Sequence, residues 1–288
     1  MPAVDAVLAI DIGGTKQLVA VVDADGGVHH VHRAPTDTAD PWRSLVPLVD
    51  ATRSAWSGPP LVACGVGCGG PMTPGGDAVS PINIEAWRGF PLRAAVAELT
   101  GLATVVDNDA KALALGEGWR GAAAGSQHYV GMVVSTGVGG GVVVDGRLLE
   151  GASGNAGHIG HVIVEPGGAR CGCGARGCLE AEASGTAIAR ATGRPAAEAP
   201  VEVRRRTGTL VGRAVASVVA LLDVRLAVVA GSVALGYGND FFGAANDELA
   251  ASCRLSFAQG ARIVPAGLGG AGPLVGAAAL AWRSLGRL

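Results

Sequence analysis

Lysine is scarce in this sequence: of its 22 basic residues only Lys16 and Lys111 are lysines, and the others are arginines. An excess of either charge is also missing, since the formal net charge is −2 and the pI is near 6.3. Bulk electrostatic attraction for nucleic acid or for an anionic membrane is therefore excluded, and a small neutral or anionic partner is favoured. The arginine run 204–206 is interpreted as a solvated helix face.

No stretch has the ~18 uninterrupted apolar residues that a membrane helix needs, and the N-terminus lacks a basic region followed by an apolar core. We therefore expect a cytoplasmic protein without a membrane partner. Six cysteines are too few for a secreted disulfide scaffold of this length. Three of them lie close together, which favours reduced thiolates on a metal ion.

Two similar glycine-rich segments indicate a duplicated architecture. Near the N-terminus, a strand at 6–10, a Gly-Gly turn and a strand at 18–22 predict a hairpin, and a third strand is predicted at 28–32. The same order returns from Val130, where "STGVGGG" supplies the turn. Strands and helices alternate along all 288 residues, which predicts an α/β fold of two domains with a cleft between the copies. Helices are predicted at 41–56, 91–100, from about Asp109, at 181–192, 209–222, 239–252 and 274–285.

A metal site is predicted from the spacing His161-x9-Cys171-x-Cys173-x4-Cys178. Three thiolates and one imidazole suit tetrahedral zinc, and four protein ligands leave no open position, which is typical of a structural site. Glycines between the cysteines allow the tight bends that bring the thiolates together. The alternative is that these cysteines are buried apolar residues or a redox pair.

The first hairpin turn is a candidate phosphate site. In "DIGGTK" at 11–16, a strand delivers Asp11 to a turn whose glycines let backbone N–H groups approach an anion, with Thr15 and Lys16 as further donors. The motif matches neither a P-loop nor the Rossmann fingerprint. An ordinary hairpin turn is an equal alternative for one motif, and the repeat at 135–141 favours two phosphate-binding turns.

The segment "VVDNDAKALALGE" at 105–117 supplies a candidate catalytic carboxylate. Asn108 and Asp109 stand where a strand ends and a helix begins, and an aspartate there is often only an N-cap. If ATP is bound, Asp109 is placed to accept the proton of a hydroxyl that attacks the γ-phosphate. Asp11 would then hold Mg²⁺ through water.

These motifs make the sequence similar to the ROK family of repressors, open reading frames and sugar kinases. The resemblance covers nearly the whole chain, and the cysteine motif with its upstream histidine is its most specific part. It rests on "DIGGTK" at 11–16, "GVGCGGP" at 65–71, "NDA" at 108–110, "STGVGGG" at 135–141, "GHIGH" at 157–161, "CGCGARGCLE" at 171–180 and "AGS" at 230–232.

The resemblance implies an actin-like (ribonuclease H-like), duplicated two-domain α/β fold. We expect a smaller N-terminal domain, 1–107, to which a last helix, 274–288, returns. A larger C-terminal domain, 108–273, would carry the zinc loop 157–180. Family members are commonly dimers or tetramers, so a homo-oligomer is expected.

The resemblance also assigns roles to residues. Asp109 would be the catalytic base, and His161 would bind zinc with one ring nitrogen and the sugar with the other. The zinc would do no chemistry but would fix the loop that recognises the sugar. The residues implied to face the sugar are Gly70, Asn83, Asn108, Asp109, His158, His161 and Glu180. Those implied to bind ATP, with Mg²⁺, are Asp11, Gly13, Gly14, Thr15, Lys16, Thr136, Gly137 and Gly231.

One departure bears on the sugar. Glucose-phosphorylating members carry glutamate where this chain has His158, whereas bacterial N-acetylmannosamine kinases are similar to this chain there. A carboxylate accepts hydrogen bonds from two neighbouring hydroxyls, whereas a neutral imidazole accepts one and donates one. We therefore expect phosphorylation of the 6-hydroxyl of N-acetyl-D-mannosamine, with glucose as the alternative sugar and polyphosphate as an alternative donor.

Two non-catalytic alternatives remain. Repressors of the family carry an N-terminal helix-turn-helix domain, and only about five residues precede the first strand here, so DNA binding is not expected. A sugar-binding protein without catalysis would not need Asp109 beside intact phosphate turns.

Overall fold

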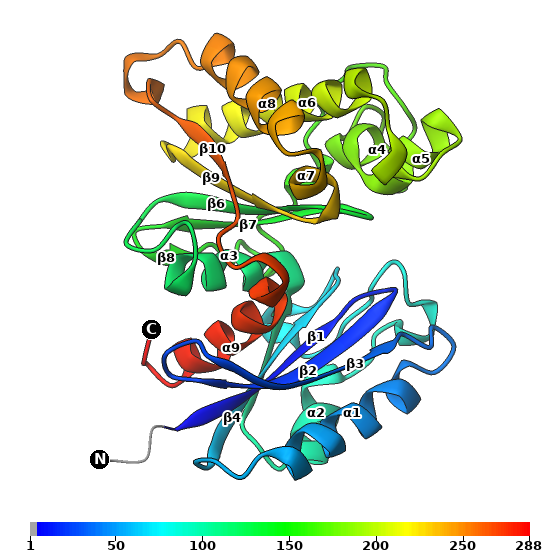
Figure 1. Ribbon diagram of the computed structural model, residues 1–288, viewed down its shortest axis with the longest axis vertical. Coiled ribbons are helices and arrows are strands. Elements are labelled where there is room, and N and C mark those ends of the chain that lie inside the picture. The colour runs from blue at the N-terminus through cyan, green and yellow to red at the C-terminus, as the bar shows by residue number, and fades with distance from the viewer. Residues whose placement is uncertain (1–4) are drawn as a thin grey trace. The chain divides into compact units, whose positions relative to one another are not determined.

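Strand β1 (Ala6–Ile12) is the centre of the first sheet in the computed structural model, which describes residues 5–288 (Figure 1). The sheet order is β3-β2-β1-β4-β5, with β1, β4 and β5 parallel and β2 and β3 antiparallel to their neighbours. All seven residues of β1 are buried, as expected of a strand covered on both faces. The other strands are β2 (Lys16–Asp23), β3 (Val28–Pro35), β4 (Leu61–Cys68) and β5 (Thr104–Asn108).

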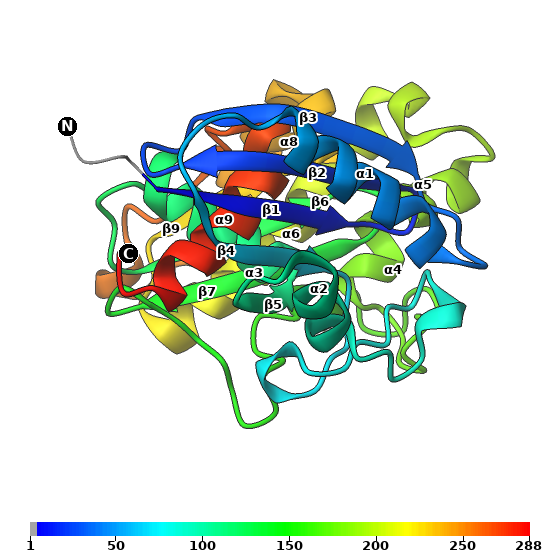
Figure 2. The ribbon, with the colours of Figure 1, turned by 90° about the horizontal axis from the view of Figure 1, so that it is seen from below.

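Helices cover both faces of this sheet. On one face, α1 (Pro41–Ala55) and α2 (Leu92–Thr100) bury residues such as Leu45 and Val96 against it. On the other face lies α9 (Gly272–Ser284), with α3 (Asp109–Arg120) packed along it (Figure 2). The approach is close enough that a Cβ on Gly65 would lie 1.8 Å from the carbonyl oxygen of Ala277, so only glycine fits there.

The second sheet repeats the first. Its order is β10-β9-β6-β7-β8, and each strand pairs as its counterpart does: β6 with β7 and β7 with β8 antiparallel, and β6 with β9 and β9 with β10 parallel. The predicted duplication is therefore confirmed by topology. These strands are β6 (Tyr129–Val134), β7 (Val138–Val144), β8 (Arg147–Leu148), β9 (Leu226–Ala230) and β10 (Arg262–Pro265).

Five helices accompany the second sheet: α4 (Leu179–Ala183), α5 (Gly185–Thr192), α6 (Val201–Leu222), α7 (Ser232–Tyr237) and α8 (Asn239–Ser252). Two predictions were wrong here. The helix predicted at 181–192 is divided by Ser184, whose hydroxyl caps α5 by accepting from Ala187 N at 3.1 Å. The helix predicted from residue 209 begins at Val201, so the arginine run lies inside α6.

Short 3-10 turns complete the chain: η1 (Pro74–Gly76), η2 (Glu85–Trp87), η3 (Ile159–His161), η4 (Ala196–Glu198), η5 (Ser256–Ala258) and η6 (Gly269–Ala271). No helix within residues 5–288 is long and apolar enough to span a bilayer.

The chain divides into two compact units. The first comprises residues up to 121, 150–156 and 268–288, and the second comprises 122–149 and 157–267. The last helix thus shares a unit with β1 and β4. The domain division expected at residue 107 stays a prediction, and residues 1–4 of its first domain lie outside the described part of the chain.

Candidate functional site

The first hairpin turn lies beside Asn83. Gly13 N donates to Lys16 O at 3.0 Å and closes the turn between β1 and β2. A Cβ on Gly14 would lie 2.6 Å from Cβ of Asn83, so the missing side chain is what lets the two segments meet. Two of the predicted site residues, one for phosphate and one for sugar, are thus neighbours in the first unit.

Asp11 and Asp109 lie on either side of β4, Asp11 near the end of β1 and Asp109 directly after β5. In the sheet register Asp11 is opposite Gly67, and Gly67 is opposite Asp107. A Cβ on Gly67 would lie 3.5 Å from Cα of Asp109 and 3.6 Å from Oδ1 of Asp11, which puts both carboxyl-bearing residues over the same glycine. The N-cap of α3 is Asn108, whose Oδ1 accepts from Ala110 N and Lys111 N, so the cap does not require Asp109.

The electrostatics of this pair are unfavourable for two free carboxylates. Burial, and then the nearby charge of Asp109, raise the pKa of Asp11 to about 7, against a lowering by Lys16. A divalent cation would reverse this shift, because it favours the ionised form. The charge of the carboxyl pair therefore favours a bound cation, and so does its geometry.

Asp11→Asn tests this electrostatic picture. Because the pKa of Asp11 in the folded protein is about 7, above the value of 3.8 that is usual for an aspartate, burying this carboxyl costs stability that grows as pH rises from about 4 to about 7 and stays constant above pH 7. Three pKa units correspond to at most about 4 kcal/mol. In EDTA without nucleotide, we expect the variant to gain stability over the wild type at pH 8 and much less at pH 5. Urea unfolding at both pH values measures this, and an equal difference at each pH would contradict the shift.

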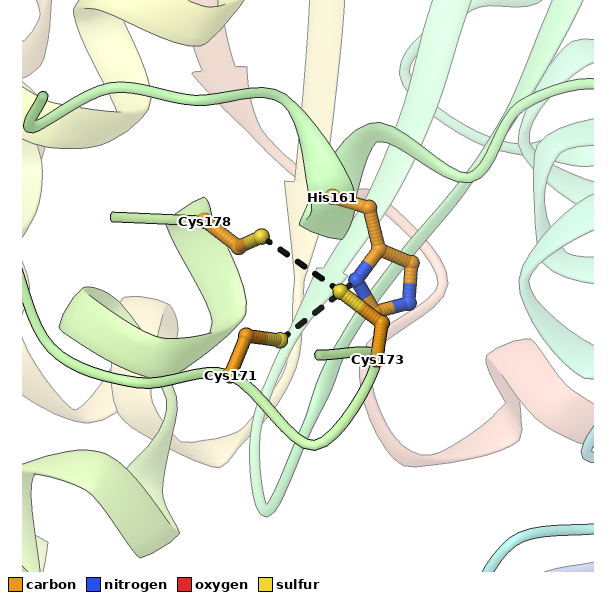
Figure 3. Close-up of side chains that lie close together, drawn as sticks. All are labelled: His161, Cys171, Cys173 and Cys178. Atoms are coloured by element: carbon orange, nitrogen blue, oxygen red, sulfur yellow. Dashed lines mark hydrogen bonds between the residues drawn. The ribbon is translucent and has the colours of Figure 1, made fainter. Parts of the chain in front are cut away.

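The predicted metal ligands converge in the second unit (Figure 3). His161 ends η3, Cys171 and Cys173 lie in the following loop, and Cys178 precedes α4. Their ligand atoms all lie within 4.8 Å of one another. Cys173 Sγ and Cys178 Sγ are 3.7 Å apart, and Cys171 Sγ is 3.7 Å from His161 Nδ1.

These separations suit a tetrahedral ion and exclude a disulfide. A disulfide needs about 2.05 Å between sulfurs. Zinc–sulfur bonds of about 2.3 Å at tetrahedral angles place two sulfurs about 3.8 Å apart, close to what is observed. The donors also fit the expected chemistry, since thiolates and imidazole are ligands that zinc prefers.

Local backbone conformation explains part of this convergence. Gly174 and Gly177 have φ of +95° and +73°, and a Cβ on Gly177 would lie 1.8 Å from Glu165 O. Gly172 has neither a positive φ nor a close neighbour, so the predicted need for glycine was wrong at that position.

A carboxylate on α4 anchors the loop independently of metal. Glu182 accepts from Ala169 N at 2.6 Å and pairs with Arg206 at 2.7 Å. Burial alone would raise the pKa of Glu182, but the hydrogen bonds from Arg206 and Ala169 hold it below its usual value. Arg205 and Arg206 are exposed, as expected of a solvated helix face, but Arg204 is half-buried. Arg206 also holds the cysteine loop to α6 through Glu182.

The remaining cysteines lie outside this cluster. Cys64 and Cys68 are fully buried on β4, and burial raises the pKa of the Cys64 thiol to about 12. They are core thiols of the first unit.

His158 lies beside His161, the predicted metal ligand. Their rings are nearly parallel, with centroids 6.2 Å apart and an interplanar angle of 16°. His161 turns Nδ1 towards the thiols, which directs its other ring nitrogen away from them (Figure 3). The two histidines that are predicted to face the sugar are therefore neighbours in the second unit.

Glu180 joins the cysteine loop to the second glycine-rich turn. Its Oε2 accepts from Val138 N at 3.0 Å, and a Cβ on Gly137 would lie 2.9 Å from that oxygen. Gly231 borders the same turn with a φ of +101°, and a Cβ there would lie 2.2 Å from Val134 O. The predicted residues Thr136, Gly137, Glu180 and Gly231 are thus grouped by short contacts within the second unit.

Some contacts at this turn had no signal in the sequence. The hydroxyl oxygens of Ser135 and Ser232 are 2.9 Å apart, which joins the turn to the start of α7. Lys111, one of only two lysines, also contacts residues distant in sequence, Glu150 and Gly154, which no pattern in the sequence indicated. Contacts of this kind are evident only in the folded chain.

Two sheets of identical order, each opened by a glycine-rich hairpin, define an actin-like α/β fold. The model of the ROK family matches residues 7–284, and the chain belongs to this family.

Named relatives include several sugar kinases. The N-acetylmannosamine kinase of Citrobacter koseri is 39% identical over 250 residues, which cover 80% of this chain and 84% of that protein. The ROK hexokinase structure from Thermus thermophilus has a TM-score of 0.84 and 31% identity, covering 98% of this chain and 99% of the other. The ROK glucokinase of Streptomyces griseus, solved with glucose and AMPPNP, has a TM-score of 0.82 and 30% identity, covering 96% and 99%.

Proposed function

We propose that this protein transfers the γ-phosphoryl group of ATP to the 6-hydroxyl of N-acetyl-D-mannosamine. The main observation in support of kinase activity is the placement of Asp11 and Asp109 over Gly67, next to the glycine turn at 13–15. Phosphoryl transfer asks a protein mainly for positioning, charge neutralisation and a carboxylate that accepts a proton. The similarity to N-acetylmannosamine kinases and the presence of His158 support the choice of sugar.

In this mechanism the oxygen of the sugar 6-hydroxyl forms a bond to the γ-phosphorus, and Asp109 accepts the proton of that hydroxyl. The bond between the γ-phosphorus and the oxygen that leaves with ADP breaks. Asp11 would hold Mg²⁺ through water, and the ion would neutralise phosphate charge. The backbone of Gly13 and Gly14, with Thr15 and Lys16, would donate to phosphate oxygens. In the second unit, Thr136, Gly137 and Gly231 are proposed to line the nucleotide site.

The sugar would be held by the side chains of Asn83, Asn108, His158, His161 and Glu180 and by the backbone at Gly70. A structural zinc bound by His161 and the three clustered cysteines would keep the His158 loop in one conformation. It would supply no chemistry, because four protein ligands complete its coordination.

A substrate panel tests the proposal. Purified protein is assayed for ADP formation with N-acetylmannosamine, glucose and N-acetylglucosamine, each with ATP and with polyphosphate. The highest kcat/KM is expected for N-acetylmannosamine with ATP. Activity on glucose alone would favour the second candidate, a glucokinase, which the likeness to the Streptomyces griseus enzyme supports. No phosphorylation of any sugar would leave a binding or regulatory protein.

His158→Glu should change the preference between sugars. A carboxylate can accept hydrogen bonds from two neighbouring hydroxyls of glucose, whereas the imidazole matches an acetamido neighbour. We expect the kcat/KM ratio of glucose to N-acetylmannosamine to rise roughly tenfold, the size of one lost or gained hydrogen bond. Steady-state kinetics on both sugars measure the ratio. His128→Glu, at an exposed position directly before β6, is the control. An unchanged ratio would show that His158 does not set specificity.

A further inference from the structure

Lys111 is buried in the first turns of α3, two residues after Asp109. Its side chain is only 1% exposed, which is rare for lysine unless every donor is paired. Its Nζ contacts Glu150 Oε2 at 2.6 Å, Asp107 Oδ1 at 2.9 Å and Gly154 O at 3.1 Å. The ammonium has three donors, so this set uses all of them.

Lys111 and its partners come from three parts of the first unit. Asp107 is the last residue but one of β5, Lys111 belongs to α3, and Glu150 and Gly154 belong to the segment 150–156. One buried charge therefore ties this segment to the backbone on both sides of Asp109.

The segment 150–156 has a second attachment. The Asn155 amide donates from Nδ2 to Met72 O at 3.0 Å and accepts from Met72 N at 3.4 Å, two residues after Gly70. The chain enters the segment after Leu149 of the second unit and returns to that unit at Gly157, next to His158. The segment is therefore continuous along the chain with the loop that carries His158.

The charges show that Lys111 is required by its surroundings. Burial raises the pKa of Asp107, and Lys111 opposes that rise. Without the ammonium, Asp107 would be a buried carboxyl without a paired cation. Glu150 would lose the ion pair that holds it to α3.

We propose that Lys111 is a positioning residue for phosphoryl transfer, which holds the segment 150–156, the part of the chain that leads into the His158 loop, to the helix that carries Asp109. This inference rests on the proposed function, because its effect is exerted on the proposed base and on the sugar loop. Lys111 itself contacts neither sugar nor nucleotide in this scheme.

The test compares Lys111→Met with Glu150→Gln in the full-length protein. Loss of the attachment should lower kcat/KM for the sugar by roughly 10–100-fold, as losses of supporting contacts do, while KM for ATP stays nearly unchanged. Glu150→Gln should show a smaller change of the same kind. Because both act on one contact, the double variant should be no worse than Lys111→Met. Lys111→Arg keeps the charge and should recover part of the loss.

A matched control separates positioning from stability. Val96→Ala opens a space in the core of the same unit, away from the segment, and should lower Tm without changing the kinetic constants. Hydrogen exchange of residues 150–156 should become faster in Lys111→Met than in Val96→Ala. If Lys111→Met fails to fold, Glu150→Gln decides by the same readouts.

Unchanged kinetic constants in an active, folded Lys111→Met or Glu150→Gln protein would overturn the positioning role and leave the proposed function intact. Equal rises of KM for sugar and ATP would also overturn it, since they indicate general damage. A wild-type protein inactive on the whole panel would instead overturn the proposed function, and the positioning role with it.

Discussion

Asp109→Asn is expected to lower kcat for sugar phosphorylation by about 10³-fold, within the range found for loss of a general base. The substitution keeps the shape of the side chain but removes the oxygen that accepts the hydroxyl proton. It also removes one negative charge beside Asp11, which lowers the pKa of Asp11 and favours the ionised form that would hold Mg²⁺. The helix should persist, because Asn108 is the N-cap of α3.

Two measurements establish the effect. A coupled assay for ADP gives kcat, and calorimetry gives the affinity for the sugar, which should be nearly unchanged. Asp25→Asn is a suitable control, because its carboxylate is 91% exposed in a turn of the same unit. Retained turnover in Asp109→Asn would remove this residue from the mechanism.

Loss of the metal is expected to have the second large effect. Cys173→Ser should reduce zinc from about one ion per chain to a small fraction, and should weaken sugar binding roughly 10–100-fold. Cys173 is exposed, so the change takes almost nothing from the core. The consequence should therefore come from the ion, which no longer fixes the loop between His161 and Cys178.

Metal analysis and calorimetry on the same preparation test this expectation. Cys253→Ser, in the same unit but outside the cluster, should leave zinc content and sugar affinity unchanged. Dialysis of the wild type against a chelator should reproduce the Cys173→Ser result. Sugar affinity that survives loss of the metal would show that the ion does not support the sugar site.

Much of the fold could be predicted because its signals are local. The hairpin around Gly13 and Gly14 and its repeat at 135–141 were evident from apolar runs and glycine turns. The duplication that they predicted is confirmed by the strand orders of the two sheets. Prediction failed where a polar side chain competed with helix propensity, as at Ser184, and where the arginine-rich start of α6 lacked an apolar pattern.

The convergence of His161 with the three clustered cysteines was also predictable, because the four residues lie within eighteen positions and thiolate chemistry restricts what they can bind. The closeness of Asp11 to Asp109 was harder to predict from the sequence. It depends on Gly67, which separates strands distant in sequence and leaves room for both carboxyl groups.

The sequence by itself determined the family, the repeated α/β design and the types of residue available for catalysis, since each is encoded in short spacings and in backbone preferences. The tertiary structure alone decided how those residues are supported: that Asn108 caps the helix of Asp109, that Glu180 holds the second turn, and that Lys111 lies among Asp107, Glu150 and Gly154. Such contacts join segments far apart along the chain. They depend on strand register and helix packing, which no local pattern of residues specifies.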